Sequence, residues 1–459
     1  MTATEVSGLT PGAHRERSFL GHPPGLAYIV FTEAWERFSF YGMQALLVLY
    51  MTGHLLHAGT VEGVAGFAAF RGVVEGVTGP LSVQALASQI FGLYVGLIYF
   101  TPVLGGLVGD RVTGRRAAVI IGAVLMAGGH FLMAFEASFL AALLLLILGS
   151  GFLKGNLAAQ VGSLYAKTDQ RRDAGFQLYC MAINVGAFVA PLVCGTLGEL
   201  YGWHYGFAAA GVGMLVGIVV YLAGARHLPP EAPRATAEAR PGLQAGDGRL
   251  IASLLALLGL TSLFWVAQTQ VWNTYPMWLR DRVDRGVFDA TIPVTWFQSL
   301  DSLAVLLLAP GVIWMWRRQS SRQVEPGEMT KIVLGCMAFA VACAGLALGE
   351  VTAAGKVALI WPVLFHFICA IAYLYAAPVA LALVSRAAPP AVNAMMVGTY
   401  YLALFVGGLV SGWLGRFYEQ MPAAGFWLMH GAIVGVGGLL ILLLRPVFIR
   451  LLRLDAPTA

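Results

Sequence analysis

The sequence predicts an all-α membrane protein with about twelve transmembrane helices in two six-helix bundles. Of its 459 residues, 58% are hydrophobic and 11% are charged, whereas a soluble domain carries about 25% charged residues. Apolar stretches of about 20 residues or more, long enough to cross a bilayer as a helix, recur along the whole chain. They lie near residues 24–52, 82–109, 114–136, 137–165, 173–200, 204–225, 249–279, 293–316, 329–350, 356–386, 390–415 and 424–449. We therefore expect a multi-pass protein of the lipid bilayer.

A polar linker over residues 227–248 separates the first six stretches from the last six. It is rich in Pro, Ala, Gly and charged residues, too polar to span a membrane and too short for a further pair of helices. Two six-helix halves around a central cavity are the arrangement of the major facilitator fold. We expect five parts: a cytoplasmic segment 1–23, a bundle 24–226, the linker 227–248, a bundle 249–449 and a cytoplasmic tail 450–459. The Gly-rich insert 54–80, between the first two stretches, predicts only a partly ordered loop.

Positive charges cluster in alternate loops between the apolar stretches. With 28 Lys and Arg against 23 Asp and Glu, the net charge is +5. The clusters are Arg111, Arg115 and Arg116; Lys167, Arg171 and Arg172; Arg226, Arg234 and Arg240; Arg317, Arg318 and Arg322; and Arg445, Arg450 and Arg453. Cytoplasmic loops of membrane proteins carry such an excess of cations. The pattern predicts cytoplasmic termini and a cytoplasmic linker in a cell membrane, such as a bacterial inner membrane, and it is not a nucleic-acid signal.

The sequence also argues against several kinds of site. All five cysteines fall inside expected helices, which predicts free buried thiols rather than disulfides. The polar first 20 residues lack an apolar core, so we expect no cleavable signal peptide. We find no nucleophile motif, metal-ligand spacing or phosphate loop in the sequence. We therefore expect a protein that binds and moves a solute, without enzymatic activity and without a cofactor.

Three charges lie inside the first apolar stretch: Glu33, Glu36 and Arg37. Each costs about 2.5–3.5 kcal/mol in the middle of a membrane helix. Their spacing of i, i+3 and i+4 places them on one helical face. Such a face must point to a protein interior or to a water-filled path. It is therefore the first candidate for a functional site.

A loop with acidic and basic residues follows the second stretch. Asp110, Arg111 and Arg115 stand where the loop signature of major facilitator proteins has its Asp and Arg residues. The resemblance implies that they hold helix ends together as an inner gate on the cytoplasmic side. The Gly residues before them would let helices approach closely. The alternative is a plain basic loop.

Four motifs, in order along the chain, resemble those of the proton-coupled oligopeptide transporter (POT) family. The first is Glu33-x-x-Glu36-Arg37-Phe38-x-Phe40-Tyr41, where the family has Glu-x-x-Glu-Arg-Phe-x-Tyr-Tyr. The others are 149–156, which contains Lys154; 179–186, which contains Asn184; and 296–300. The resemblance implies import of di- and tripeptides by alternating access between the two bundles, with protons as the coupling ion. We also expect the monomer to be the functional unit.

The charged residues of these motifs fit a peptide zwitterion. Arg37 offers a planar fork for a carboxylate, and Lys154 offers a point charge that can change partner. We expect Glu33 and Glu36 to neutralise both cations in the empty protein. A buried carboxylate can then take a proton when its cation is drawn to the substrate. The alternative is a structural ion network that ties two helices together.

Further polar and aromatic residues are expected around the substrate. The resemblance assigns Asn184 to the substrate, the alternative being a hydrogen bond between helices. The other expected contacts are Tyr41, Tyr94, Gln268, Trp296 and Tyr400. For the aromatic residues, packing between helices is the alternative.

Two neutral residues stand where the family has an outer ion pair. Gln44 takes the place of an arginine, and Thr269 takes the place of an acid. Losing one partner of a buried pair costs about 3–5 kcal/mol, while losing both can be nearly neutral. We therefore expect an outer gate closed by hydrogen bonds or packing around Gln44 and Thr269.

A second pair of changes concerns the site for the peptide ammonium. Tyr373 replaces the family's glutamate, and Asp301 replaces its asparagine. We expect Asp301 to receive the ammonium, with Tyr373 as a hydroxyl partner; the alternative is that Asp301 caps a helix or pairs with a cation. The coupling proton is then expected on Glu33, Glu36 or Asp301. His366, two helical turns before Tyr373, is either a further titrating group or a packed residue.

Two other functions stay open at this level. A transporter of another small carboxylate-bearing or drug-like solute would use the same fold, because fold does not fix substrate. A sensor that does not transport would need a soluble signalling segment, and neither terminus predicts one. The retained Arg37, Lys154 and Asn184 favour a substrate with a carboxylate, so short peptides are the expected partners.

Overall fold

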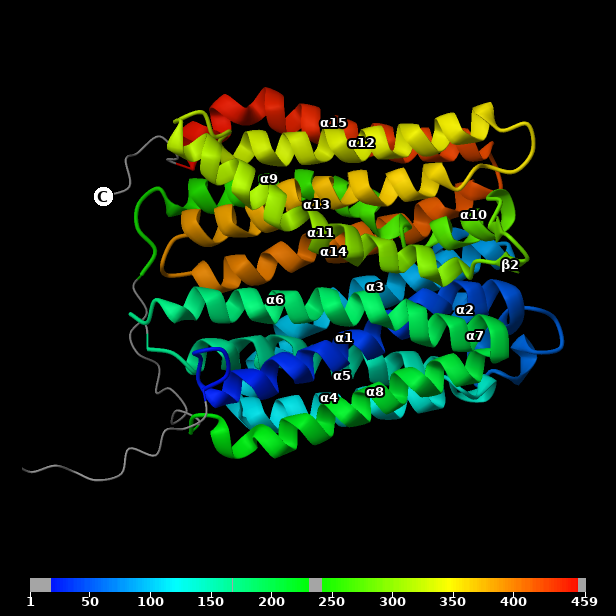
Figure 1. Cartoon of the computed structure of the whole chain (residues 1–459), viewed down its shortest axis with the longest axis horizontal. Coiled ribbons are helices and arrows are strands. Elements are labelled where there is room, and N and C mark those ends of the chain that lie inside the picture. The colour runs from blue at the N-terminus through cyan, green and yellow to red at the C-terminus, as the bar shows by residue number, and fades with distance from the viewer. Residues whose placement is uncertain (1–17, 167, 231–241, 453–459) are drawn as a thin grey trace, which may run out of the picture.

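The structure is a computed structural model that describes residues 18–166, 168–230 and 242–452. The expected segment 1–23, linker 227–248 and tail 450–459 lie partly outside the described residues. Within the described residues the chain is almost entirely helical, and the long helices run side by side along the long axis of the molecule (Figure 1). The prediction of an all-α protein is confirmed.

The N-terminal helices form one half of the molecule (Figure 1). They are α1 (Pro24–Tyr50), α3 (Val83–Val108), α4 (Arg115–Leu132), α5 (Phe139–Ser163), α6 (Arg171–Ala190), α7 (Thr196–Tyr201) and α8 (Trp203–Gly224). α1 packs on α6 and α8, while α5 packs on α3 and α4. A single π-helical turn over Pro191–Gly195 joins α6 to α7, starting at a proline that has no backbone N–H to donate.

The C-terminal helices form the other half. They are α9 (Asp247–Gln270), α10 (Thr274–Arg282), α11 (Val294–Ser321), α12 (Glu328–Thr352), α13 (Ile360–Ala387), α14 (Asn393–Leu414) and α15 (Ala423–Leu451). α12 packs on α13 and α15, while α9 packs on α14 and α15. Residues 271–273 separate α9 from α10, and Asn273 among them is fully buried.

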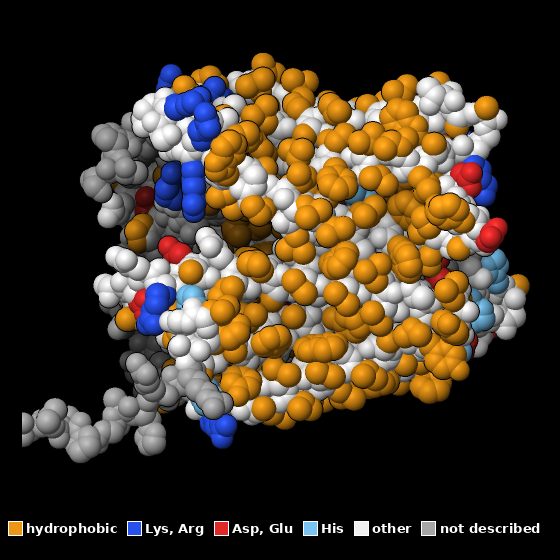
Figure 2. All heavy atoms as spheres, in the orientation of Figure 1, with side chains coloured by type: hydrophobic (Ala, Val, Ile, Leu, Met, Phe, Trp, Pro, Cys, Tyr) orange, Lys and Arg blue, Asp and Glu red, His pale blue; other side chains and the backbone are white. Residues whose placement is uncertain are grey.

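The molecule has the surface of a membrane protein. In the part of the chain that the structure describes, eleven helical stretches are long and apolar enough to cross a bilayer. α1 is a further helix of 27 residues that runs among them and carries the charged stripe (Figure 1). Figure 2 shows hydrophobic side chains over the middle of the molecule and charged side chains at its two ends. The prediction of about twelve spans is confirmed.

The two ends of the molecule differ. We call the linker end the one where α3, α8 and α15 finish and where α4 and α9 begin. The opposite end carries α2 (Phe67–Thr78), α10 and a short hairpin of β1 (Gly286–Val287) and β2 (Ala290–Thr291). α2 lies inside the insert 54–80, so the expected loop contains an ordered helix. It is bounded by Gly66 and Gly79 at φ of 75° and 78°, a backbone conformation that favours glycine.

The halves meet where α3 packs on α14 and α6 packs on α11. A Cβ on Gly92 of α3 would come within 2.6 Å of the Gly408 carbonyl oxygen on α14, so glycine permits this close approach. In Figure 2 the surface is hollowed between the halves at the linker end. At the opposite end, hydrogen bonds join the halves. We call this opposite end, where hydrogen bonds join the halves, the closed end.

Candidate functional site

The charged stripe of α1 forms a compact cluster inside the N-terminal half. Arg37 Nε donates a 2.6 Å hydrogen bond to Glu33 Oε1 and lies 3.0 Å from Glu36 Oε2. Both carboxylates are fully buried. A guanidinium between two carboxylates is a charge-assisted arrangement of the strong kind. The cluster follows from local sequence, because the i, i+3 and i+4 spacing leaves all three side chains on one face.

The two glutamates of the cluster are held differently. Glu33 also accepts a 2.6 Å hydrogen bond from the Tyr179 hydroxyl of α6. Neither oxygen of Glu36 has a hydrogen-bond partner in the described structure, because its contact with Arg37 lies outside hydrogen-bond geometry. Tyr179 is absent from the residues expected around the substrate, although it stands in the fifth-stretch motif. Glu36 is therefore the less satisfied acid of the pair.

Lys154 approaches this cluster from α5 without joining it. Its Nζ lies 3.9 Å from the ring centroid of Phe40 and 5.5 Å from that of Tyr99. Within the described residues this buried Nζ has no hydrogen-bond partner. Glu33 and Glu36 contact Arg37 directly, whereas their charges act on Lys154 from a distance, without a hydrogen bond in the described structure. The ring faces of Phe40 and Tyr99 take the place of a carboxylate through cation–π attraction.

A second acidic position lies in the C-terminal half. Asp301 of α11 has 19% of its side chain exposed, and its Oδ1 lies 3.8 Å from Nδ1 of His366 on α13. His366 is fully buried, and neither of its ring nitrogens has a hydrogen-bond partner in the described part of the chain. Tyr275 of α10 packs edge-on against this imidazole. Both Asp301 and His366 are candidates from the sequence, but the sequence does not predict that they face each other.

Aromatic side chains from both halves line the space between the two acidic positions. Tyr41 of α1 packs against Trp272 of the C-terminal half at a ring-centroid distance of 5.1 Å. Tyr373 of α13 lies edge-on to Trp265 of α9. Tyr99 lies close enough to Arg37, Tyr41 and Tyr373 to interact electrostatically with them. Sequence reasoning missed Tyr99.

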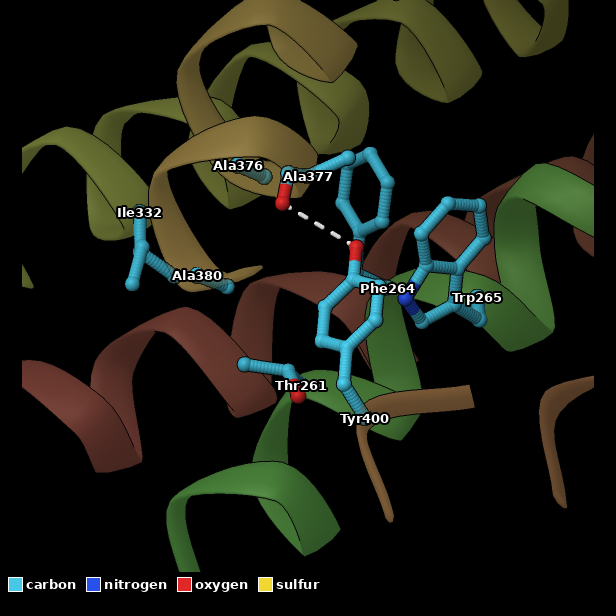
Figure 3. A pocket seen from close by; sticks show the side chains of 8 residues that line it. All are labelled: Thr261, Phe264, Trp265, Ile332, Ala376, Ala377, Ala380 and Tyr400. Atoms are coloured by element: carbon cyan, nitrogen blue, oxygen red, sulfur yellow. Dashed lines mark hydrogen bonds between the residues drawn. The ribbon is translucent and has the colours of Figure 1, made fainter. Parts of the chain in front are cut away.

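Tyr400 points into the C-terminal half rather than toward the space between the halves. Figure 3 shows its ring beside Trp265 and its hydroxyl aimed at the Ala377 carbonyl of α13, a hydrogen bond of 3.0 Å. The small pocket around it is lined by Thr261, Phe264, Trp265, Ile332, Ala376, Ala377, Ala380 and Tyr400. The neighbouring Tyr401 is far more exposed and lies close to the charge of Arg37. Tyr401 is therefore a better candidate for substrate contact than Tyr400.

The remaining expected substrate residues are dispersed. Tyr94 is buried near Glu36. Gln268 is buried, and its carbonyl oxygen has no hydrogen-bond partner among the described residues. The Asn184 amide donates to the Cys180 carbonyl of its own helix. Trp296 lies at the closed end, where its indole donates a 2.7 Å hydrogen bond to Thr196 of α7. This places Trp296 in a contact between halves instead of beside the charged cluster.

Hydrogen bonds join the halves at the closed end, but neither Gln44 nor Thr269 takes part in those of the described residues, and their gate role stays a prediction. Thr269 donates to the Trp265 carbonyl of its own helix, and the Gln44 carbonyl oxygen has no partner in the described structure. Glu199 of α7 instead reaches across to the start of α11. It accepts hydrogen bonds from the backbone N–H groups of Val294 and Thr295 at 2.9 and 2.8 Å, and from the Thr295 hydroxyl at 2.7 Å. A carboxylate at a helix N-terminus satisfies exposed donors and the helix dipole together.

Further hydrogen bonds cross between the halves at this closed end. Their pairs are Gln84 with the Gly415 carbonyl, Arg416 with the Thr78 carbonyl, Arg280 with Thr52, and Ser82 with Glu419. A cavity of about 250 Å³ lies among them, bordered by charged and polar side chains. The closure is therefore distributed over several helix ends.

At the linker end, the ion pairs Arg115–Asp110, Arg171–Asp169 and Arg386–Glu328 of the described residues each lie within one half. Asp110 accepts a 2.8 Å hydrogen bond from Arg115, and Arg111 is exposed. The Arg171 guanidinium hydrogen-bonds to Asp169 and lowers the pKa of that carboxyl to about 2. A Cβ on Gly105 would lie 2.1 Å from the Gly151 carbonyl oxygen, which agrees with the expected close approach of helices. The gate role of Asp110, Arg111 and Arg115 stays a prediction.

The described chain has no cluster of three or more His, Cys, Asp or Glu side chains that would hold a metal ion. Its five cysteines are free thiols, and four of them are buried.

Comparison with known proteins places this site in a family. The sequence profile of the POT family matches residues 116–240 and 245–429. The chain is 29% identical to the peptide transporter YePEPT of Yersinia enterocolitica, over 96% of this chain and 97% of that protein. It is 27% identical to a di-/tripeptide transporter of Lactococcus lactis, over 95% of this chain and 98% of that protein.

Solved structures of transporters agree with this assignment. A peptide transporter POT in complex with alafosfalin is 29% identical, with a TM-score of 0.81 and coverage of 95% of this chain and 97% of that chain. A POT family transporter in complex with 5-aminolevulinic acid is 25% identical, with a TM-score of 0.80 and coverage of 94% and 98%. The profile match extends over more than half of the sequence. The chain therefore belongs to the POT family.

Proposed function

We propose that this protein imports di- and tripeptides together with protons by alternating access between its two halves. Its family supports this function, as do relatives named as peptide and di-/tripeptide transporters. The observation that carries the proposal is Lys154, a buried ammonium that has no acceptor within the described residues and lies beside a guanidinium already balanced by two carboxylates. A peptide carboxylate supplies the acceptor that Lys154 needs.

Binding of the substrate carboxylate would also determine which glutamate takes up the coupling proton. Arg37 is shared between Glu33 and Glu36, so a substrate carboxylate that draws the guanidinium away leaves a buried acid without its cation. Glu33 keeps the hydrogen bond from Tyr179, while Glu36 keeps nothing comparable. A buried carboxylate that loses its counter-charge takes up a proton. Among the expected proton acceptors, this favours Glu36 over Glu33 in the N-terminal half.

The peptide ammonium would be received in the C-terminal half by Asp301, with the Tyr373 hydroxyl as a partner. Asp301 lies close to Tyr41 of the N-terminal half and to Tyr373 of its own half. Carboxylate and ammonium groups of a short peptide would thus be held by opposite halves. Such bridging links substrate binding to the approach of the halves.

Orientation and gating complete the proposal. The cations of the linker end support a cytoplasmic location for this end and for both termini in a bacterial cell membrane. In that orientation the structure is inward-open, with Glu199 and its neighbours closing the outside. Protons serve as the coupling ion without another cofactor, and the monomer is the transporting unit.

A second candidate substrate class has specific support. The neighbour solved with 5-aminolevulinic acid binds a small molecule with one carboxylate and one amine. Such a solute would also use Lys154 and Asp301, without a peptide bond. The substrate class is therefore either a short peptide or another small amino acid-like solute.

Counterflow in liposomes distinguishes these classes. Liposomes with the purified protein are loaded with unlabelled dialanine, and uptake of labelled dialanine is followed with 5-aminolevulinic acid or dialanine as competitors. The proposal predicts counterflow that excess dialanine abolishes. In liposomes loaded with unlabelled 5-aminolevulinic acid instead, counterflow of labelled 5-aminolevulinic acid that dialanine does not reduce would assign the second class.

A further inference from the structure

Asp301 and His366 form an isolated acid–imidazole pair in the middle of the C-terminal half. Their nearest oxygen and nitrogen are 3.8 Å apart, which is an ion-pair distance when the imidazole is protonated. His366 is fully buried, yet neither ring nitrogen is hydrogen-bonded within the described structure. An unpaired buried imidazole is costly. The buried imidazole therefore needs a polar partner, and Asp301 is the acid close enough to provide one.

The surroundings of Asp301 contain no competing cation in the described part of the chain. The titratable groups close enough to interact with its charge are Tyr41 of α1, Tyr275 of α10, and Cys369 and Tyr373 of α13, besides His366. Phenols and thiols are ordinarily neutral at pH 7. The recorded ion pair of Asp301 is with His366 alone. Its counter-charge in the empty protein is therefore a proton on this imidazole or on the carboxylate itself.

We infer that Asp301 and His366 hold one exchangeable proton between them, and that this proton competes with the substrate ammonium for Asp301. The inference rests on the proposed function, which assigns the ammonium to Asp301. One carboxylate can balance one cation in a buried site, because a second cation 3–4 Å away is strongly repelled. On binding, the ammonium pairs with Asp301, and the proton leaves for solvent through the exposed part of the carboxylate. His366 then stays as a neutral imidazole.

The sign of the resulting pH effect follows from linkage. A ligand that displaces a proton binds more weakly as the pH falls, by up to about tenfold for each pH unit below the midpoint of proton binding. The effect requires an ammonium group on the ligand. His366 is thus a positioning residue that acts on the substrate through Asp301 and makes the two halves respond differently to acid.

The experiment compares dialanine with propionyl-alanine, which lacks the ammonium and keeps the carboxylate. Dissociation constants are measured for the purified full-length protein by calorimetry from pH 5 to 8, in two buffers of different ionisation enthalpy. Because both ligands carry the carboxylate that acts on Glu36, the pair is read from the difference between them. The wild-type protein is expected to release up to one more proton per dialanine bound than per propionyl-alanine bound. The dissociation constant of dialanine divided by that of propionyl-alanine should rise as the pH falls to 5. In His366→Gln this ratio should be about tenfold lower at pH 5 than in the wild type.

His130 provides a matched control in the other half. It is equally buried with both ring nitrogens unpartnered in the described structure. His130→Gln should leave the ratio as in the wild type. The inference would be overturned if the ratio of dissociation constants rose equally toward pH 5 in the wild type and in His366→Gln. Equal proton release with both ligands in the wild type would also overturn it, and that measurement needs no variant. Absence of dialanine binding at every pH would instead contradict the proposed function.

Discussion

The buried charges of the N-terminal half contact one another directly, whereas the C-terminal half has a single acid beside a single imidazole. Glu33, Glu36 and Arg37 are in direct contact, and Tyr179 adds a hydrogen bond. Asp301 and His366 are 3.8 Å apart with unpartnered ring nitrogens. Removing Arg37 strands two buried carboxylates, whereas the member of the second group that is left behind can become neutral by gaining or losing one proton. We therefore expect substitutions in the N-terminal half to affect folding and transport together, and those in the C-terminal half to affect ligand binding.

Arg37→Gln should have the largest effect. It leaves two buried carboxylates without their guanidinium, and breaking such a pair costs about 3–5 kcal/mol. We expect a lower melting temperature in detergent and dialanine uptake reduced by about 100-fold or more. Tyr179→Phe, which removes one hydrogen bond to Glu33, should cost far less in both assays. Equal loss in the two variants would contradict the central place of Arg37.

Lys154→Met should separate binding from stability. The substitution removes a charged hydrogen bond to the substrate, worth about 1.5–3 kcal/mol, so dialanine should bind about 10–100-fold more weakly. The melting temperature should not fall, because Nζ has no acceptor in the described structure. Lys331 is a matched cation that lies 4.0 Å from the Trp316 ring centroid and is paired with Glu325. Lys331→Met should show the reverse, a loss of stability with binding retained.

Asp301→Asn should weaken binding of ligands that carry an ammonium. Loss of one charge-assisted contact predicts about tenfold weaker binding of dialanine, with little change for propionyl-alanine. Competition assays with both ligands measure the difference. Dialanine uptake close to that of the wild type would contradict the assignment of Asp301 as the group that binds the peptide ammonium.

Glu199→Gln should have the smallest effect and should act on conformation. An amide cannot satisfy the two N–H groups of α11 as a carboxylate does, at a cost of about 1 kcal/mol, so the outward-open population should rise about fivefold. Spin labels at the exposed Val77 and Val351, one in each half at the closed end, report the opening as a longer distance. Glu75→Gln is the matched control, because Glu75 bonds to Arg71 and Leu81 within one half. An unchanged distance distribution in Glu199→Gln would remove Glu199 from the gate.

The sequence predicts the helices and the charged stripe because both depend on local patterns. Hydropathy over about 20 residues defines each span, and helical spacing alone puts Glu33, Glu36 and Arg37 on one face. The same argument about charges in membrane helices applies to Glu199, which the sequence reasoning passed over. α2 was missed because Gly72 and Gly76 lower its helix propensity.

The partners of the site residues depend on distances between helices, which the sequence pattern does not contain. Lys154 meets the ring of Phe40 instead of a glutamate, and Asp301 meets His366 on another helix. Tyr400 and Tyr401 are consecutive in α14, so their side chains point about 100° apart around the helix axis. The rotation of α14 about its axis therefore determines which ring faces the other half. Such choices are fixed by packing, so the residue types were predictable and their contacts were not.

The central claim is that the proton gradient drives peptides through this protein. The most direct test is accumulation of labelled dialanine in liposomes with an alkaline interior, compared with liposomes at equal pH. Proton coupling predicts that dialanine accumulates above its external concentration, that a protonophore abolishes this accumulation, and that counterflow occurs at equal pH. Dialanine exchange that does not respond to the gradient would leave peptide binding standing and contradict proton coupling.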